Sequence, residues 1–583
     1  MSRTRRTAQA HGKVGPVFYA SLVVAGLFIL WGVFFTESLT RFNTAAMGVV
    51  VSSFGWVYIL ATTLFIAFLL FLALSRFGQI RLGKDHERPE FSTVSWLAML
   101  FSAGMGVGLV FYGVAEPMSH LASPPLGIGE PMTIEAGQRS MQYTFFHWGL
   151  HAWAIYGLVG LALAYFQFRK GASGLISAAF YPLLGERVHG PIGWTIDVLA
   201  IFVTALGVAT SFGISATQMN SGLGYVFGLP QGLAVQVVII VVVLCLFLAS
   251  ALSGLDKGIK YLSNLNMILM GAVMLFVLAV GPRLFVLDTF VASIGNYLQN
   301  FLHMSFTSGA FVGEEGTAWL EGWTLYYWAW WMMWVMWVGT FIARVSRGRT
   351  IREFVAGVLV VPSVLSFLWF SVLGGTAINE ELFGGGGIAD AVAESLDTAL
   401  FVTFDQFPGA AVISVVAILL IGSFFITSAD SAAFVLAMLS TNGDQNPTAR
   451  MKVLWGVLIA VFAFVLLLAG GLQAVQQVAI ITGVPFTILL IGMAVSLYTS
   501  VTQDAFPGLR PHLPHMPGTA RREARREHRH GGGPDGIPAS DDARASSNGA
   551  PPSGGTGRGS DGTPRSGTTR DPSGDTPDQV PTG

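Results

Sequence analysis

The sequence predicts an all-α integral membrane protein with twelve transmembrane helices, and two observations lead to this fold class. Of the 583 residues, 52% are hydrophobic and 11% are charged, whereas soluble domains carry about 25% charged residues. Twelve apolar stretches are also long enough to span a hydrocarbon core about 30 Å thick. In chain order, these stretches cover residues 16–36, 50–75, 93–115, 143–166, 192–216, 232–254, 259–281, 323–343, 354–374, 409–438, 451–470 and 475–500.

The distribution of basic residues predicts which loops face the cytosol. Nineteen of the 32 lysines and arginines fall in segments placed inside, three fall in outer loops and ten lie in the C-terminal tail. Because cytoplasmic loops carry an excess of lysine and arginine, both termini are expected in the cytosol. The first stretch is as long as a spanning helix and no small-residue cleavage pattern follows it, so a signal peptide is not expected. These observations predict a multi-pass protein of a bacterial-type inner (plasma) membrane.

Two segments outside the spans differ from the rest. Residues 287–303 are amphipathic and lie in an outer loop, so they are expected to form a helix on the membrane surface or along a subunit contact. Residues 505–583 hold a basic run and then a Gly-, Ser-, Pro- and Asp-rich stretch that cannot bury a core and should be disordered. The run either binds anionic lipid or is an ordinary cytosolic tail. Its arginines are Arg521, Arg522, Arg525 and Arg526.

One apolar stretch, YYWAWWMMWVMWVG, is unusually rich in tryptophan. It contains Trp328, Trp330, Trp331, Trp334 and Trp337. Interfacial tryptophans normally lie at helix ends, but with Arg344 at the cytosolic end Trp334 would lie about 15 Å deep, near the membrane midplane. Such a cluster, with no carboxylate beside it in the sequence, favours a quaternary ammonium ligand bound by cation–π contacts. The alternative is the packing of bulky side chains between helices.

Alternating glycines interrupt the third stretch, LFSAGMGVGLVFYGVAEP. They are Gly104, Gly106 and Gly108. Each costs about 1 kcal/mol of helix propensity, so three together favour local unwinding, as in the broken helices with which transporters bind ions and substrate carboxylates. Close helix packing through small residues is the alternative, although that motif has a period of four residues.

The fourth stretch, FFHWGLHAWAIYGLVGLALAYF, carries three aromatic side chains of interest. At about 100° per residue of a continuous helix, Trp153 and Tyr156 share a face and Trp148 flanks it at about 140° from Trp153. Interfacial aromatic residues are the alternative interpretation. His147 and His151 also share a face, but no third ligand is apparent, so structural histidines are expected rather than a metal site.

The tenth stretch contains SFFITSADSAAF, which places hydroxyl groups in an apolar helix. Thr427, Ser428 and Ser431 supply these hydroxyls. Hydroxyl and carbonyl oxygens suit a small, hard cation, while hydrogen bonding of the hydroxyls to the preceding helical turn is an equal alternative. Asp430 either lines an ion path or lies near the cytosolic end in water.

Enzyme signatures are missing from the sequence. It contains no Walker loop, no GxSxG elbow and no HExxH motif. We therefore expect no enzymatic activity, no ATP drive by this chain, no cofactor other than a coupling ion and no nucleic-acid partner. A channel is disfavoured because no charged pore ring or filter-like carbonyl repeat is visible.

Four motifs together resemble the betaine/choline/carnitine transporter (BCCT) family, in that family's order and spacing. They are GMGVGLVFYGVAEP, HWGLHAWAIY, WAWWMMW followed by ARVSRGRTIREF, and FFITSADS. The resemblance covers about residues 14–500 and implies a homotrimer whose subunits have a core like that of the neurotransmitter-sodium symporters.

The resemblance also implies six parts of the chain. These are a basic cytosolic N-terminus, two peripheral helices with a cytosolic loop, a first five-helix repeat, an outer loop with an amphipathic helix, a second, inverted five-helix repeat and a cytosolic, largely disordered tail. Their respective ranges are 1–14, 15–92, 93–281, 282–318, 319–500 and 501–583.

By resemblance, matching positions form a substrate site. The central aromatic box around a trimethylammonium group would consist of Trp330, Trp331 and Trp334. The cage and its route would be completed by Trp148, Trp153 and Tyr156. The substrate carboxylate would meet the backbone of Ala103, Gly104, Met105, Gly106 and Gly108. Choline-selective members resemble this motif but carry an aspartate at the position of Gly108, so a zwitterion such as glycine betaine is expected here rather than choline.

The resemblance further implies a sodium site. Its ligands would be the backbone carbonyls of Ser102, Met105 and Phe424 and the hydroxyls of Thr427 and Ser428. The family's second sodium site draws on two threonines one helical turn apart, but here Thr204 is followed by Val208, and Trp337 stands where phenylalanine is usual. We therefore expect one sodium ion per substrate.

The expected function is sodium-coupled import of a quaternary-ammonium zwitterion by a secondary active transporter. The alternatives are proton-coupled or exchange transport of choline, carnitine or ectoine, and an osmolyte sensor that has lost transport. A sodium-coupled amino acid transporter of the same fold is disfavoured, because a primary ammonium prefers hydrogen-bond acceptors to tryptophan faces.

Overall fold

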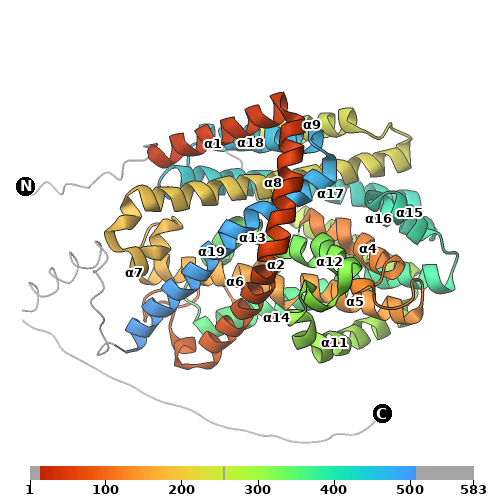
Figure 1. The fold of residues 1–583 in the computed structure, drawn as a ribbon, viewed down its shortest axis with the longest axis horizontal. Coiled ribbons are helices and arrows are strands. Elements are labelled where there is room, and N and C mark those ends of the chain that lie inside the picture. Colours follow the sequence, from red (N-terminus) through yellow and green to blue (C-terminus); the bar gives the residue numbers. More distant parts are fainter. Residues whose placement is uncertain (1–13, 105, 254–255, 507–583) are drawn as a thin grey trace, which may run out of the picture. The chain divides into compact units, whose positions relative to one another are not determined.

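The computed structural model describes residues 14–104, 106–253 and 256–506, and within these ranges it contains helices and no β-strand (Figure 1). The expectations for the basic N-terminus and for most of the tail, including Arg521, Arg522, Arg525 and Arg526, concern residues outside these ranges. Met105 also lies outside them, and the side chains of residues 101–104 are not described.

The helices follow one another through the whole described chain. The first nine are α1 (Pro16–Phe34), α2 (Thr36–Leu74), α3 (Thr93–Gly104), α4 (Val107–Ala122), α5 (Ile134–Trp148), α6 (Leu150–Ala164), α7 (Tyr181–Leu184), α8 (Pro191–Phe227) and α9 (Leu233–Ser253). They continue with α10 (Asp256–Val280), α11 (Arg283–Phe306), α12 (Gly313–Leu320), α13 (Tyr326–Val345), α14 (Ile351–Phe383), α15 (Ile388–Glu394), α16 (Ala399–Asp405), α17 (Ala410–Ser440), α18 (Ala449–Leu468) and α19 (Gly471–Ala505).

The predicted all-α, multi-span fold is confirmed. In the described ranges, nine helices are long and apolar enough to cross a membrane by length and composition. Each of the twelve predicted spans coincides with one helix or with two consecutive ones. The second span is longer than predicted, because α2 begins at Thr36 and runs for 39 residues.

The glycine-rich third span is interrupted, as its alternating glycines predict. Helix α3 ends at Gly104 and α4 begins at Val107, with Gly106 between them in an extended conformation (φ −150°, ψ −176°). Backbone groups at such a break are released from the helical hydrogen-bond ladder. In transporters, groups released in this way bind ions and substrates.

The fourth span also breaks, which the sequence analysis did not predict. Gly149 (φ −96°, ψ −138°) separates α5 from α6, so the predicted span at 143–166 is made of two consecutive helices rather than one continuous helix. A Cβ atom at Gly149 would lie 2.5 Å from the Phe145 carbonyl oxygen and 2.8 Å from the Phe367 ring. Close approach of α14 therefore requires a glycine here. The 140° angle assumed between Trp148 and Trp153 does not apply, because they lie on different helices.

Helix α13, which carries the tryptophan cluster, lies in the middle of the bundle (Figure 1). It packs against α6, α8 and α19, while α17 packs against α8 and α10. Nearly every side chain of α13 is buried. The cluster therefore faces protein on all sides rather than lipid.

The amphipathic segment predicted at 287–303 forms α11, which packs against α5 and α14. Its other face exposes a stripe of leucine and valine side chains. The stripe consists of Leu284, Leu287, Val291, Leu298 and Leu302. The expected helix is thus confirmed, while its role at a membrane surface or subunit contact stays a prediction.

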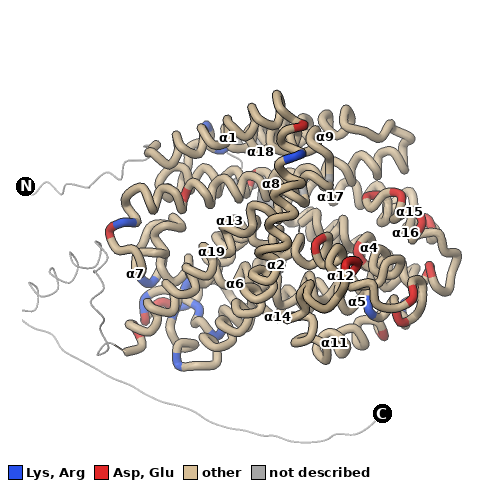
Figure 2. The backbone as a smooth tube through the Cα atoms, in the orientation of Figure 1, with Lys and Arg blue, Asp and Glu red and all other residues tan. Residues whose placement is uncertain are grey.

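Charged residues gather at different places in the fold. Figure 2 shows many lysines and arginines near α7 and many acidic residues near α15 and α16. The basic and acidic loops are thus separated in the fold, and the assignment of the basic loops to the cytosol stays a prediction. At the basic end, Arg347 forms an ion pair with Glu87 at 3.0 Å, and residues 80–82 hydrogen-bond to residues 348–351. These contacts connect the loop before α3 to the loop after α13.

Candidate substrate and ion site

Three tryptophans of α13 form the centre of the site. The rings of Trp330 and Trp331 stack with their centroids 5.0 Å apart, and Trp334 meets Trp330 edge-on at 5.4 Å. None of the three side chains is more than 4% exposed. Their positions agree with the predicted box, in which a cation would lie against several ring faces.

Aromatic residues of α5 and α6 extend this cluster. The ring centroid of Trp148, at the end of α5, lies 4.8 Å from that of Trp331. The ring centroid of Tyr156, on α6, lies 6.1 Å from that of Trp331. Trp153 contacts Tyr156 at 5.7 Å, which confirms their predicted common face. The structure therefore brings together all six aromatic residues expected in the cage.

The interrupted helix lies directly against the cage. A Cβ atom added at Gly106 would lie 3.3 Å from the Trp334 ring, and one added at Gly108 would lie 2.6 Å from Trp330 and 3.2 Å from Trp148. These glycines therefore allow the backbone to reach the tryptophan rings. Ala103 and Gly104 belong to the last turn of α3, on the other side of the break.

Hydrogen bonds hold most of the indole rings in place. Trp331 donates to the carbonyl of His147 at 3.1 Å, which lies in the last turn of α5, and Trp334 donates to the carbonyl of Gly207 at 3.1 Å. The indole N–H of Trp330 is different, because it is buried and has no hydrogen-bond partner among the described residues. An unpaired buried donor is costly, so this group is available to a ligand acceptor.

A buried carboxylate lies beside the cage, contrary to the expectation from the sequence. Glu116, on α4, accepts a hydrogen bond from the Trp148 indole at 2.7 Å and another from the Tyr327 hydroxyl at 2.5 Å. Sequence reasoning missed Glu116 because it is 32 residues from Trp148 and 211 from Tyr327. The available signal was an ionisable residue within an apolar span, which usually has a functional role.

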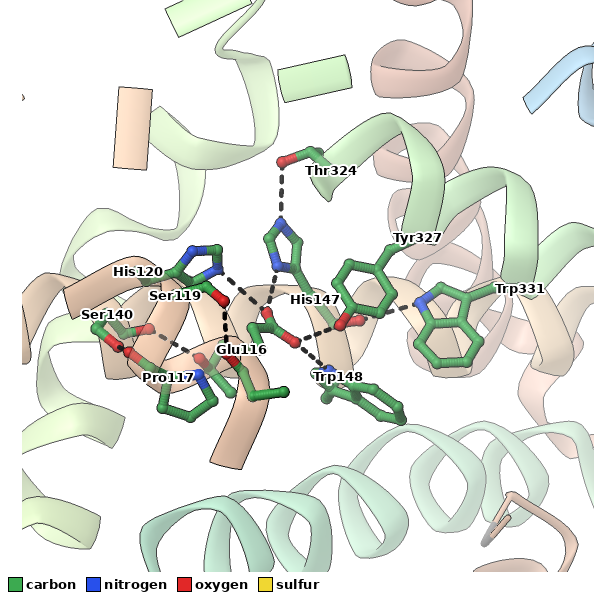
Figure 3. Close-up of polar contacts among 12 residues, drawn as sticks. Glu116, Pro117, Ser119, His120, Ser140, His147, Trp148, Thr324, Tyr327 and Trp331 are labelled. Atoms are coloured by element: carbon green, nitrogen blue, oxygen red, sulfur yellow. Dashed lines mark hydrogen bonds and ion pairs between the residues drawn. The ribbon is translucent and has the colours of Figure 1, made fainter. Parts of the chain in front are cut away.

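The two histidines of the fourth span have separate partners. His147 Nδ1 lies 2.6 Å from Glu116 Oε1 and its Nε2 lies 2.9 Å from the Thr324 hydroxyl, while His151 contacts Ser305. His120 and Glu116 supply the further ligand groups that the sequence did not reveal, and one atom from each of His120, Glu116 and His147 lies within 4.8 Å of the others. Because Glu116 and His147 already satisfy one another, a hydrogen-bonded network explains this cluster (Figure 3).

Three of the five residues expected to bind sodium line a separate cavity of about 500 Å³ between α3, α10, α13 and α17. Its lining includes Phe424, Thr427, Ser428, Asn266 and Trp337. The Thr427 hydroxyl donates to carbonyls of the preceding turn, at 3.0 Å each, and accepts from Asn266 at 3.1 Å. Hydrogen bonding within the helix, one of the two interpretations, is therefore observed, and ion binding stays a prediction.

The expected second ion site is less well assembled. Thr204 lies on α8 and donates to the carbonyl of Ala200 at 2.6 Å, and its neighbour one turn on is Val208. Trp337 instead lines the cavity described above.

Asp430 is 6% exposed, so its expected alternative position in water at the cytosolic end is wrong.

A multi-pass helical bundle with interrupted helices around a buried aromatic cage is typical of a membrane transporter for small molecules, rather than an enzyme. The family model for the betaine/carnitine/choline family transporters (BCCT) matches residues 16–506, and the chain belongs to this family. It is therefore a multi-pass transporter of the plasma membrane.

Three similar proteins are named as transporters of glycine betaine or of ectoine and hydroxyectoine. The glycine betaine transporter OpuD of Bacillus subtilis (strain 168) is 51% identical over 84% of this chain and 95% of its own length. A probable glycine betaine transporter of Desulfitobacterium hafniense (strain Y51) is 44% identical over 84% and 98%, respectively. An ectoine/hydroxyectoine transporter of Virgibacillus pantothenticus is 44% identical over 82% and 95%.

Proposed function

We propose that this transporter imports glycine betaine or a similar quaternary-ammonium zwitterion, coupled to sodium by alternating access. The aromatic cage carries the proposal. Trp148, Tyr156, Trp330 and Trp331 are packed within 6.3 Å of a neighbouring ring in the cage, at the depth where two helices are broken. A trimethylammonium group has no N–H to donate, so ring faces bind it better than hydrogen-bond acceptors do.

The opposite end of the substrate would meet hydrogen-bond donors. The interruption between α3 and α4 exposes backbone groups, and the Trp330 indole N–H lacks a partner among the described residues. Broken helices in transporters direct their N-terminal ends at anionic groups. A carboxylate two bonds from the ammonium would therefore be held while the ammonium lies in the cage, which favours a zwitterion over choline.

The 500 Å³ cavity supports the ion part of the proposal. Phe424, Thr427 and Ser428 provide a carbonyl and two hydroxyls next to the broken α3, and such oxygens suit a small cation. The expected carbonyls of Ser102 and Met105 would complete the ligand set. With Val208 in place of a threonine, the proposal is one sodium per substrate.

Uptake of radiolabelled glycine betaine into proteoliposomes tests the proposal. We expect accumulation that requires an inward sodium gradient and stops when potassium replaces sodium. Uptake that is indifferent to sodium would contradict the coupling and favour proton-coupled or exchange transport. Stronger uptake of choline, carnitine or ectoine would correct the substrate, and the relative named for ectoine makes this comparison necessary. Binding without uptake would indicate a sensor.

Assembly and regulation are further parts of the proposal. The exposed apolar stripe on α11 supports a homotrimer contact or a membrane-surface contact.

The arginines at 521, 522, 525 and 526 would bind anionic lipid and adjust uptake to osmolality. Deletion of residues 517–583 should then change the osmolality dependence of uptake, and an unchanged dependence would leave the tail without this role.

A further inference from the structure

Glu116 is enclosed by four side chains that belong to three helices (Figure 3). It is fully buried and lies between α4, α5 and α13. One carboxylate oxygen accepts from Trp148 and Tyr327, at 2.7 and 2.5 Å. The other lies 2.6 Å from His147 and 3.4 Å from His120. The oxygen that faces Trp148 and Tyr327 therefore acts as an acceptor, and the other oxygen faces the two histidines.

The groups around Glu116 suit an ionised carboxylate. The indole N–H of Trp148 can only donate, so the oxygen facing it must accept. In the tautomer that carries its proton on Nδ1, His147 donates to Glu116 and accepts from the Thr324 hydroxyl at Nε2. A cationic His120 would bury a charged N–H without an acceptor, since its Nδ1 has no hydrogen-bond partner among the described residues. With this tautomer the cluster is one anionic carboxylate with neutral histidines.

The two donors to Glu116 are themselves walls of the aromatic cluster. Trp148 lies 4.8 Å from Trp331, and Tyr327 stacks on Trp331 with centroids 5.6 Å apart. A carboxylate that accepts from the edge of an aromatic ring increases the negative potential of the ring face. The carboxylate also acts on the cage directly through an apolar medium in which charges are weakly screened.

We infer that Glu116 is a specificity-determining residue that supplies the counter-charge for the substrate ammonium from behind the aromatic rings. The inference rests on the proposed function, because it assumes that a quaternary ammonium occupies the cage. Gly108 leaves no room for a carboxylate in the cage itself, since even a Cβ atom would meet Trp330 at 2.6 Å. Glu116 supplies the charge without occupying this space, and the substrate carboxylate keeps its own partners.

An uncharged isostere distinguishes this electrostatic role from a structural one. 3,3-Dimethylbutyrate has the shape and the carboxylate of glycine betaine, but a tert-butyl group replaces the trimethylammonium. Binding of both compounds to the purified full chain can be followed by tryptophan fluorescence. We expect Glu116→Gln to weaken glycine betaine binding about tenfold and to change binding of the isostere less than about twofold. A parallel loss for both compounds would show that Glu116 only shapes the cage, and would overturn the inference.

Two controls make the result specific. Asp197 is another buried carboxylate, held by Ser177 away from the cage, so Asp197→Asn should leave the ratio of the two affinities unchanged. If Glu116→Gln does not fold, infrared difference spectra of the unaltered protein replace it. Glycine betaine should then shift a carboxylate stretching band that the isostere leaves in place, and equal spectra would overturn the inference. Unaltered protein that binds neither compound would instead contradict the proposed substrate class.

Discussion

Gly108 lies so close to Trp330 that a Cβ atom at this position would be 2.6 Å from the Cη2 atom of the indole. Such a distance cannot be accommodated without movement of a ring that is 1% exposed and stacked on Trp331. The same Cβ would lie 3.2 Å from Trp148. One glycine therefore sets the distance between the interrupted helix and two walls of the cage.

The first prediction follows from this contact. Gly108→Ala should displace Trp330 and raise the KM for glycine betaine uptake at least about tenfold, because closely packed rings cannot absorb the added methyl group. Gly271→Ala is the matched control, since nothing lies within 4 Å of a Cβ atom there. An unchanged KM in Gly108→Ala, measured at equal protein levels in proteoliposomes, would contradict the packing argument.

The second prediction concerns the box itself. Trp331→Ala and Trp334→Ala should each reduce apparent affinity for glycine betaine at least tenfold, because a desolvated cation–π contact contributes up to about 2 kcal/mol. Trp455→Ala removes a buried tryptophan of α18 that hydrogen-bonds to Ser440 outside the cage. It should lower the melting temperature but not the affinity. Unchanged affinity in both box variants would remove the box assignment.

Local sequence signals predicted much of this site. Three glycines with a period of two indicated the interruption between α3 and α4, because glycine lowers helix propensity whatever its neighbours are. The extended start of α2 was missed because Thr36, Thr40 and Thr44 look unlike a span. Their hydroxyls hydrogen-bond to carbonyls four residues earlier, as in Thr40 to Thr36 and Thr44 to Thr40.

Contacts between distant residues were beyond sequence reasoning. The break at Gly149 depends on the approach of Phe367 from α14, and nothing near Gly149 in the sequence signals it. The same is true of Glu116, whose partners on α5 and α13 are brought to it only by the fold. Resemblance to a family suggested which aromatic residues meet, but a buried polar network is specified by packing.

The third prediction concerns pH and stability at the basic end of the bundle. Hydrogen bonds from the Arg347 guanidinium hold the pKa of Glu87 below its ordinary value of 4.5. The ionised carboxylate is therefore the form that stabilises the fold. Its contribution is present above about pH 4.5 and is lost as the pH falls through the lowered pKa of the folded state.

The effect should be small, because both side chains are partly exposed and water screens them; we expect less than about 1 kcal/mol. Glu87→Gln should lower the melting temperature at pH 7 and have progressively less effect as the pH falls below 4.5. Arg347→Gln and the variant with both substitutions complete a double-mutant cycle. Once either side chain has been replaced, replacement of the other should change the melting temperature little. A melting difference that is the same at pH 7 and pH 3.5 would contradict the ion-pair explanation.

The fourth prediction tests the ion site. Thr427→Val and Ser428→Ala should each raise the sodium concentration for half-maximal uptake at least about fivefold, because each removes one oxygen ligand from a cation that needs several. Thr427→Ser retains the hydroxyl and should stay close to the unaltered protein. Ser431→Ala changes the same cavity wall without touching a proposed ligand, so it controls for altered hydration. Equal sodium dependence in Thr427→Val and Ser431→Ala would contradict the ion site. The Thr427 hydroxyl would then serve only to hydrogen-bond to the carbonyls of Ser423 and Phe424 in the preceding turn.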